Sequence, residues 1–87
     1  MRVNFSPRFK RAYKKVPPHI QSDFGEKMVL FTQNPYHPSL KTHKLTGKLQ
    51  ECLGFYLRDG YRVLFEFTGP NTVDLLIIGP HDIYKRF

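Results

Sequence analysis

The sequence predicts an α+β fold in which two helices pack on one face of a twisted, mostly antiparallel sheet of four strands, in the order β-α-α-β-β-β. Two observations predict this fold. Apolar residues recur at helical spacing between residues 9 and 31, and apolar runs separated by turn residues fill the chain from residue 53 onward. A chain of 87 residues has room for one two-layer core, so residues 1–87 are expected to form a single domain.

One strand and a helical hairpin are expected in the first 35 residues. Residues 1–5 alternate between apolar and polar side chains, which indicates a strand with one buried face. Ser6-Pro7 offers an N-cap and a proline at the first helical position, Pro17-Pro18 separates two helices, and Asn34-Pro35 ends the second. The apolar stripes of the two helices are Phe9, Ala12, Tyr13 and Val16, and Ile20, Phe24, Met28 and Phe31.

A surface loop and three strands are expected in the rest of the chain. Residues 34–50 contain two prolines, one glycine and no acidic residue, and because no apolar period runs through them they predict a functional surface loop. Strands are expected at residues 53–57, 61–67 and 73–78. The last of these is apolar at nearly every position, as in an interior strand that is covered on both faces.

The turn between residues 57 and 61 determines which side chains share a face. A three-residue turn with Gly60 in the left-handed conformation pairs Leu57 with Tyr61 and keeps the apolar positions together, whereas a two-residue turn would separate them. The preferred register directs Leu53, Phe55, Leu57, Tyr61, Val63, Phe65 and Phe67 toward the helices. On the open face it leaves Tyr56, Arg62, Leu64 and Glu66.

Positive charge is concentrated in two segments that contain no acidic residue. The 14 Lys and Arg residues outnumber the 7 Asp and Glu residues, which gives a formal net charge of +7. Residues 1–22 and 27–50 contribute ten of these cations and none of the acids. Such a surface attracts polyanions, nucleic acid first among them, or an acidic protein partner.

Composition also narrows the class of protein. Cys52 is the only cysteine and no histidine pair has the spacing of a metal site, so neither a disulfide, a metal nor another cofactor is expected. No apolar run approaches the length of a membrane span, and the basic N-terminus lacks the apolar stretch of a signal peptide. A cytoplasmic protein without a membrane partner is therefore expected.

Three motifs, in the order and spacing found here, resemble the RelE/ParE toxin superfamily of bacterial toxin-antitoxin modules. They are Asn34-Pro35 leading to HKLTG at residues 43–47, YRVLF at residues 61–65, and IGPHDIY at residues 78–84. The resemblance spans the whole chain and is closest to the RelE and YafQ-like branch. Members of that branch cleave mRNA in the ribosomal A site and are neutralised by a cognate antitoxin. The resemblance thus implies an mRNA interferase whose partners are mRNA, the ribosome and an acidic antitoxin.

The resemblance also implies a set of catalytic residues. His43 matches a loop histidine of the YafQ-like members, Arg62 a catalytic strand arginine, and His81 the catalytic histidine near the C-terminus. Tyr84 resembles a C-terminal aromatic residue that stacks on RNA or contributes to cleavage.

These side chains suit RNA cleavage without a metal, which needs a base, an acid and a cation. Histidine serves both proton transfers because its ordinary pKa of about 6.5 lies near neutrality. Arginine stabilises the phosphorane because its planar fork donates to two phosphate oxygens and keeps its charge. Arg62 is thus expected to stabilise the transition state and His81 to act as the acid. His43 is expected to act as the base or to orient the 2′-hydroxyl.

Further residues are expected to hold the RNA. Lysines in the loop contact phosphates, aromatic side chains stack on unpaired bases, and the cations of the first helix grip ribosomal RNA. The loop lysines are Lys41, Lys44 and Lys48, the aromatics are Tyr56 and Tyr84, and the helix cations are Lys10, Arg11, Lys14 and Lys15.

A second class of function stays open, that of a protein that binds without cutting RNA. Its two forms are a ParE-type inhibitor of DNA gyrase and a degenerate toxin that only binds its antitoxin. The ParE branch generally lacks the basic and histidine cleavage residues, so Arg62 together with His81 favours the nuclease.

Overall fold

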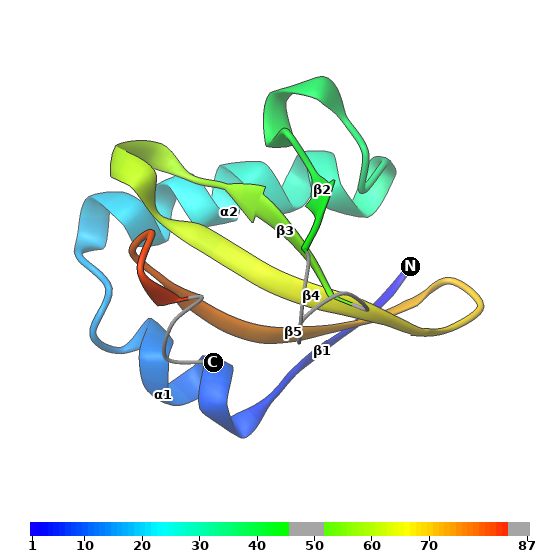
Figure 1. The fold of residues 1–87 in the computed structure, drawn as a ribbon, viewed down its shortest axis with the longest axis horizontal. Helices are drawn as coiled ribbons and strands as arrows, with labels where there is room; N and C mark the ends of the chain where they lie inside the picture. Colours follow the sequence, from blue (N-terminus) through cyan, green and yellow to red (C-terminus); the bar gives the residue numbers. More distant parts are fainter. Residues whose placement is uncertain (46–51, 84–87) are drawn as a thin grey trace.

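The protein combines two helices with a five-stranded sheet, and the predicted α+β class is confirmed (Figure 1). The computed structural model describes residues 1–45 and 52–83. Its helices and strands are β1 (Arg2–Phe5), α1 (Pro7–Tyr13), α2 (Pro18–Gln33), β2 (His43–Lys44), β3 (Leu53–Tyr56), β4 (Arg62–Gly69) and β5 (Thr72–Gly79). Within the described residues, short 3-10 turns lie at Pro38–Leu40 and Arg58–Gly60.

The sheet has the strand order β1-β5-β4-β3-β2. Strand β1 runs parallel to β5, and every other neighbouring pair is antiparallel, so the sheet is mostly antiparallel as predicted. Strand β5 lies between β1 and β4, which confirms the interior strand expected at residues 73–78. The pairing of β1 with β5 joins distant parts of the chain. A side-chain hydrogen bond of 2.9 Å, donated by Asn4 to Asp74, connects the two strands.

The expectation of four strands was wrong, and the surface loop expected over residues 34–50 was wrong in part within residues 34–45, since residues 46–50 lie outside the described residues. Leu40 is fully buried, and residues 43 and 44 form a fifth strand that pairs antiparallel with β3. A strand of two residues is too short to display an alternating pattern, so the sequence gives no sign of it. Lys41 has φ of 53°, a left-handed conformation that turns the chain into this strand.

The predicted register of the β3–β4 hairpin is confirmed. Tyr56 lies opposite Arg62, and the Leu57 N–H donates to the Tyr61 carbonyl oxygen over 2.8 Å across a three-residue turn. Gly60 has φ of 77°, as expected, and Asp59 is left-handed too with φ of 55°. Asp tolerates this conformation better than most residues do.

Both helices begin where the sequence predicts. The Ser6 side chain accepts a hydrogen bond from the Phe9 N–H over 2.9 Å, and Pro7 occupies the first position of α1. Proline also opens α2 at Pro18, and the helix ends before Asn34. Proline in the first turn therefore fixes where each of the two helices begins.

The main core lies between the helices and one face of the sheet. Phe31 of α2 contacts Phe55 of β3 and Phe65 of β4, with ring centroids 5.1 and 4.9 Å apart, and all three side chains are fully buried. The other buried members are Phe9, Val16, Ile20, Phe24, Leu40, Leu53, Leu57, Val63, Val73, Leu75 and Ile78. Burial of this apolar surface is the main force that holds the helices on the sheet.

The opposite face of the sheet is less open than the sequence suggests. Leu64, predicted to lie on an open face, is fully buried in a second cluster with Ile77 and Ile83. Phe67, predicted to lie under the helices, is instead 44% exposed because it stands near the end of β4, where it stacks on Tyr36. The polar residues of the second face therefore border a small apolar cluster.

Candidate active site

Three neighbouring strands bring His43, Tyr56 and Arg62 together on the second face of the sheet. His43 of β2 pairs with Gly54 of β3, Tyr56 follows Gly54 two residues later on the same face, and Arg62 of β4 pairs with Tyr56. These side chains form the row described below as the His43–Tyr56–Arg62 row. Two of them were predicted catalytic residues, and Tyr56 was predicted to stack on RNA bases.

The Tyr56 ring contacts both of its neighbours in the row. The His43 ring stacks on it with centroids 5.1 Å apart and planes inclined by 20°. The Arg62 guanidinium carbon lies 4.8 Å from the same ring centroid. A cation over an aromatic face is stabilised by about 0.5–1 kcal/mol at an exposed site and by about 2 kcal/mol when desolvated, and the half-buried Tyr56 and Arg62 fall between these limits. The ring therefore orients the imidazole and the guanidinium relative to each other.

A backbone contact selects the tautomer of His43. Nδ1 of His43 lies 3.1 Å from the carbonyl oxygen of Lys41, which can only accept, so Nδ1 donates in this bond. In the neutral imidazole the acceptor lone pair is then on Nε2. That nitrogen has the chemistry of a general base.

His81 is an exposed residue just beyond the end of β5. Gly79, two residues before it, pairs with Arg62, so the topology places His81 at the same end of the sheet as the His43–Tyr56–Arg62 row. The turn that carries His81 packs closely on the strand. A Cβ atom at Gly79 would lie 2.3 Å from Cγ2 of the buried Ile83, and the Ile83 N–H donates to the Pro80 carbonyl oxygen over 3.0 Å.

The other residues predicted to contact RNA, and Tyr84, are not members of the His43–Tyr56–Arg62 row. Lys41 and Lys44 are exposed on either side of His43 in the sequence, and Lys44, which pairs with Leu53, lies on the opposite face of the sheet from His43. Lys48 and Tyr84 lie outside the described residues. Lys10, Arg11, Lys14 and Lys15 belong to α1 and the turn after it, and all four are exposed.

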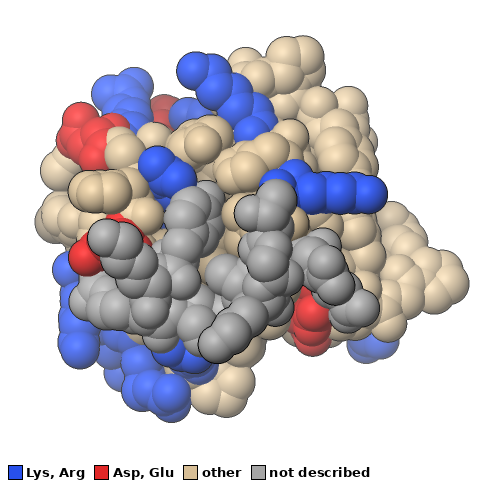
Figure 2. Space-filling view, in the orientation of Figure 1, with Lys and Arg blue, Asp and Glu red and all other residues tan. Residues whose placement is uncertain are grey.

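A groove with a volume of about 660 Å³ lies between α1 and the C-terminal end of β5. Its basic rim consists of Arg8, Arg11, Lys14 and Lys15, and its apolar lining includes Ala12, Val16, Ile77, Ile78 and Ile83. Figure 2 shows blue atoms gathered at the lower left, where Figure 1 places α1. This surface is called the α1 groove below.

Sequence reasoning identified the cations of α1 but missed the groove and the part that Arg8 takes in it. The available signal was spacing, since residues 8, 11 and 15 recur at intervals of three and four, as on one side of a helix. The apolar lining had no comparable signal, because it comes from β5 and the turn that follows.

Two further observations concern all the residues that the structure describes. Among residues 1–45 and 52–83, no three His, Cys, Asp or Glu side chains come together as a metal would require. No helix in that part of the chain is both long and apolar enough to cross a membrane.

Comparison with known proteins shows which fold this is. No protein-family model and no curated protein matches the sequence. Among solved structures, YafQ from E. coli strain BL21(DE3) superposes with a TM-score of 0.79 at 15% identity, over 97% of this chain and 98% of that chain. The YoeB/ParE toxin from Agrobacterium tumefaciens gives 0.77 at 10% identity, over 93% and 99%.

A third similar structure comes from a complex. The toxin-antitoxin complex RelBE2 from Mycobacterium tuberculosis contains a chain with a TM-score of 0.64 at 23% identity, over 91% of this chain and 95% of that one. The protein therefore has the fold of the RelE/ParE toxin superfamily, which confirms at the level of the fold the resemblance predicted from its motifs.

Proposed function

We propose that the protein is the toxin of a toxin-antitoxin pair and acts as a metal-independent endoribonuclease that cleaves mRNA in the ribosomal A site. The observation that supports this most directly is the contact of one aromatic ring, Tyr56, with both His43 and Arg62. A base, a cation and a stacking surface are thereby within one row. His81, the fourth element of the proposal, follows the strand that pairs with Arg62.

The proposed reaction begins at the ribose. His43 takes the proton of the 2′-hydroxyl on Nε2, and the 2′-oxygen attacks the adjacent phosphorus to form a crowded phosphorane. Arg62 donates hydrogen bonds to its equatorial oxygens, where negative charge accumulates. His81 protonates the 5′-oxygen as its bond to phosphorus breaks. The products are a 2′,3′-cyclic phosphate and a free 5′-hydroxyl.

The proposed RNA contacts surround this centre. Lys41 and Lys44, both exposed at the β2 edge of the sheet, neutralise phosphates of the bound RNA, and the exposed part of the Tyr56 ring offers a surface for an unpaired base. Lys48 and Tyr84 are proposed to assist from the segments that follow β2 and β5. The cations of α1 are proposed to contact ribosomal RNA.

The test is cleavage of mRNA on programmed ribosomes, with the ends of the products mapped. Wild-type protein is expected to cut within the A-site codon, and Arg62→Ala to remove the cuts. Arg2→Ala is the matched control, because Arg2 is an exposed cation on edge strand β1. The proposal would be contradicted if folded wild-type protein cut neither mRNA on ribosomes nor free RNA. Growth arrest with DNA damage, unchanged when Arg62 and His81 are both alanine, would favour gyrase inhibition.

We also propose that the acidic antitoxin binds in the α1 groove. Four cations above an apolar lining complement an amphipathic segment with carboxylates on one side and apolar side chains on the other. Arg11→Glu is expected to weaken binding of an acidic protein encoded beside this one by at least about tenfold, measured by calorimetry. Lys10→Glu makes the same charge change on α1 outside the groove lining. Equal weakening by both variants would indicate diffuse charge attraction instead.

A further inference from the structure

The relative position of Tyr56 and Arg62 depends on the three-residue turn that joins their strands. The two residues lie opposite each other, immediately before Leu57 and after Tyr61, whose backbones close the turn. Asp59 and Gly60 both have positive φ, so this turn takes a conformation that few residues adopt without support. Whatever holds the turn therefore also holds the Tyr56–Arg62 pair.

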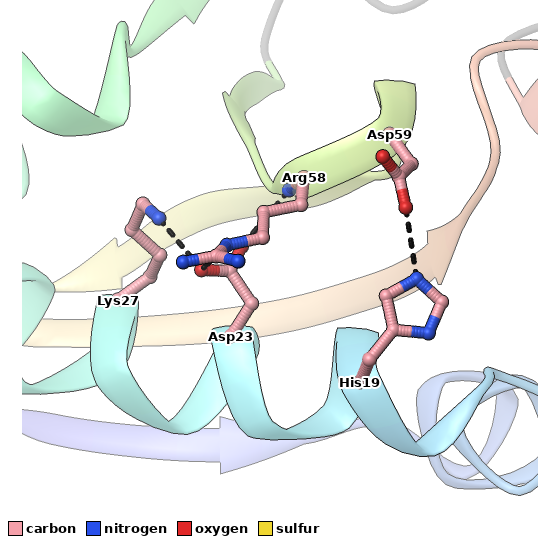
Figure 3. A network of polar contacts seen from close by, with 5 residues as sticks. All are labelled: His19, Asp23, Lys27, Arg58 and Asp59. Atoms are coloured by element: carbon pink, nitrogen blue, oxygen red, sulfur yellow. Dashed lines mark hydrogen bonds and ion pairs between the residues drawn. The ribbon is translucent and has the colours of Figure 1, made fainter.

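Asp23 of α2 holds the first residue of that turn. It is the one charged side chain that is buried among the described residues, at 2% exposure. Its Oδ2 accepts the Arg58 backbone N–H over 2.9 Å, and its Oδ1 lies 3.5 Å from the Arg58 Nε and accepts from the Lys27 Nζ over 2.9 Å. The carboxylate thus binds both the main chain and the side chain of Arg58 (Figure 3).

A second contact reaches the same turn from one helical turn earlier. His19 Nε2 lies 2.8 Å from Asp59 Oδ2, and both side chains are exposed. Figure 3 shows His19, Asp23 and Lys27 projecting from one side of α2, with the first two directed toward the turn. Exposed ion pairs contribute little, so the buried carboxylate is the stronger of the two ties.

We infer that Asp23 is a positioning residue of the active site, which fixes the β3–β4 turn so that Tyr56 lies under the Arg62 guanidinium. The inference rests on the proposed function for its effect on cleavage, but its structural part does not. Apolar packing holds α2 on the sheet, but it is non-directional and does not fix the orientation of any one peptide group. A hydrogen bond to the Arg58 N–H, by contrast, fixes one peptide group of the turn.

The experiment measures the NMR signals of the Tyr56 ring and the Arg62 side chain in the absence of RNA. In Asp23→Ala, the Arg62 Nε–H signal and the Tyr56 ring signals are expected to shift toward their values in an unstructured peptide. Asp23→Asn, whose amide oxygen can still accept from the Arg58 N–H, is expected to restore them in part. Arg58→Ala, which keeps that N–H and loses only the guanidinium, is expected to leave them in place.

Loss of stability alone is controlled by Met28→Ala, since Met28 is a half-buried member of α2 that packs on the main core. This variant is expected to lower stability without moving the Tyr56 and Arg62 signals. If Asp23→Ala does not fold, Arg58→Pro removes the same hydrogen bond from the side of the turn and is expected to move the signals equally. Unmoved signals in a folded variant that lacks this hydrogen bond would overturn the inference.

Cleavage supplies a second measurement. Single-turnover cleavage by Asp23→Ala is expected to slow by about 10- to 100-fold, as for a misplacement on the order of 1 Å, with a smaller loss of affinity for RNA. If the NMR signals move in Asp23→Ala but the wild-type protein does not cut RNA, the positioning role is upheld and the proposed function is contradicted. If the signals do not move in Asp23→Ala and the wild-type protein cuts RNA, the proposed function is upheld and the positioning role is contradicted.

Discussion

Tyr56 supports the candidate active site through its ring more than through its hydroxyl group. The recorded contacts of the ring are with the His43 imidazole at 5.1 Å between centroids and with the Arg62 guanidinium at 4.8 Å. Both contacts depend on the π face, which phenylalanine also has. Mutation can therefore separate the orientation of its neighbours by the ring from a contribution of the hydroxyl to cleavage.

Tyr56→Ala is expected to slow RNA cleavage by about tenfold, because loss of a cation–π contact of about 1–2 kcal/mol frees the guanidinium to rotate. Tyr56→Phe is expected to stay within about threefold of the wild type, since it keeps the contact. Single-turnover cleavage of RNA on ribosomes measures both. Equal losses in the two variants would show that the hydroxyl takes part in the reaction.

Asp23 is expected to make stability depend on pH in the acid range. Burial by itself would raise the pKa of this carboxyl group, but the hydrogen bonds from Lys27 and the Arg58 backbone, with the charges of both side chains, hold the pKa below its ordinary value. A lowered pKa stabilises the fold at every pH above the ordinary carboxyl value of about 4, and this contribution is lost as the pH falls through the lowered pKa.

The free energy of unfolding of Asp23→Asn is therefore expected to fall below that of the wild type by about 1.5–3 kcal/mol at pH 7. The difference should shrink steadily below pH of about 4, because the wild-type carboxylate then becomes protonated as well. Urea denaturation at pH 7, 5 and 3 measures it. A difference that is the same at all three values would show that the charge of Asp23 does not contribute.

For single residues, the sequence predicts on which face a side chain lies where a strand pattern constrains it. Arg62 and Tyr56 were assigned to the correct face, because only one register keeps the apolar positions together. The contact of Tyr56 with His43 was not predictable, since it depends on a strand of two residues. The tie from Asp23 to Arg58 spans 35 residues and depends on tertiary packing, of which one sequence carries no local signal.

Among the elements, the turn after β5 is the one that places His81. It approaches the strand closely because Gly79 has no side chain, and Ile83 occupies the space beside it. Ile83 is itself buried against Leu64 and Ile77. The position of the turn thus depends on a glycine that the sequence presents only as a turn signal.

Gly79→Ala is expected to destabilise the protein by about 1–3 kcal/mol and to displace the turn, because the added Cβ overlaps a buried methyl group. Gly25→Ala is the matched control, since a Cβ there meets nothing within 4 Å, and in a helix it is expected to stabilise by about 0.5–1 kcal/mol. Thermal unfolding measures both. Gly79→Ala with wild-type stability and cleavage would contradict the close packing of the turn.

Elements with strong terminal signals were predicted well. Ser6-Pro7 and Pro18 mark helix starts that the structure confirms, and Gly60 confirms the three-residue turn. The second cluster was missed because Leu64 reads as part of an open face when only the alternation of β4 is considered. Its burial depends on Ile83, which comes from a segment that the sequence describes only as a turn.

For the whole molecule, the excess of positive charge is expected to control association with RNA. Each phosphate neutralised releases counterions, so the logarithm of affinity falls with the logarithm of salt concentration by about 0.7 for each contact to a single strand. Replacing Lys41 and Lys44 together is expected to reduce that slope by about 1.4. Filter binding of RNA at several salt concentrations measures the slope.

Arg2→Ala serves as the control for that measurement, because it removes a charge from strand β1 at the opposite edge of the sheet from β2. Its slope is expected to match that of the wild type. An equal fall of the slope in Arg2→Ala and in the variant without Lys41 and Lys44 would mean that net charge, and not these two lysines, determines binding.

The fold of the whole molecule was the most predictable property, because the order of elements and the hydrophobic periods agree with one architecture. The number of strands and the groove were not predictable, since both arise where separate segments meet.

The pairing of β1 with β5 means that the described sheet can be completed only late in translation. Asn4 and Asp74 are hydrogen-bonded partners separated by 70 residues, so β1 cannot join the sheet until β5 has been synthesised. Contacts of this sequence separation form late and slowly. The nascent chain thus passes most of its synthesis without a complete sheet, and a partner that is already present can meet it before the sheet is finished.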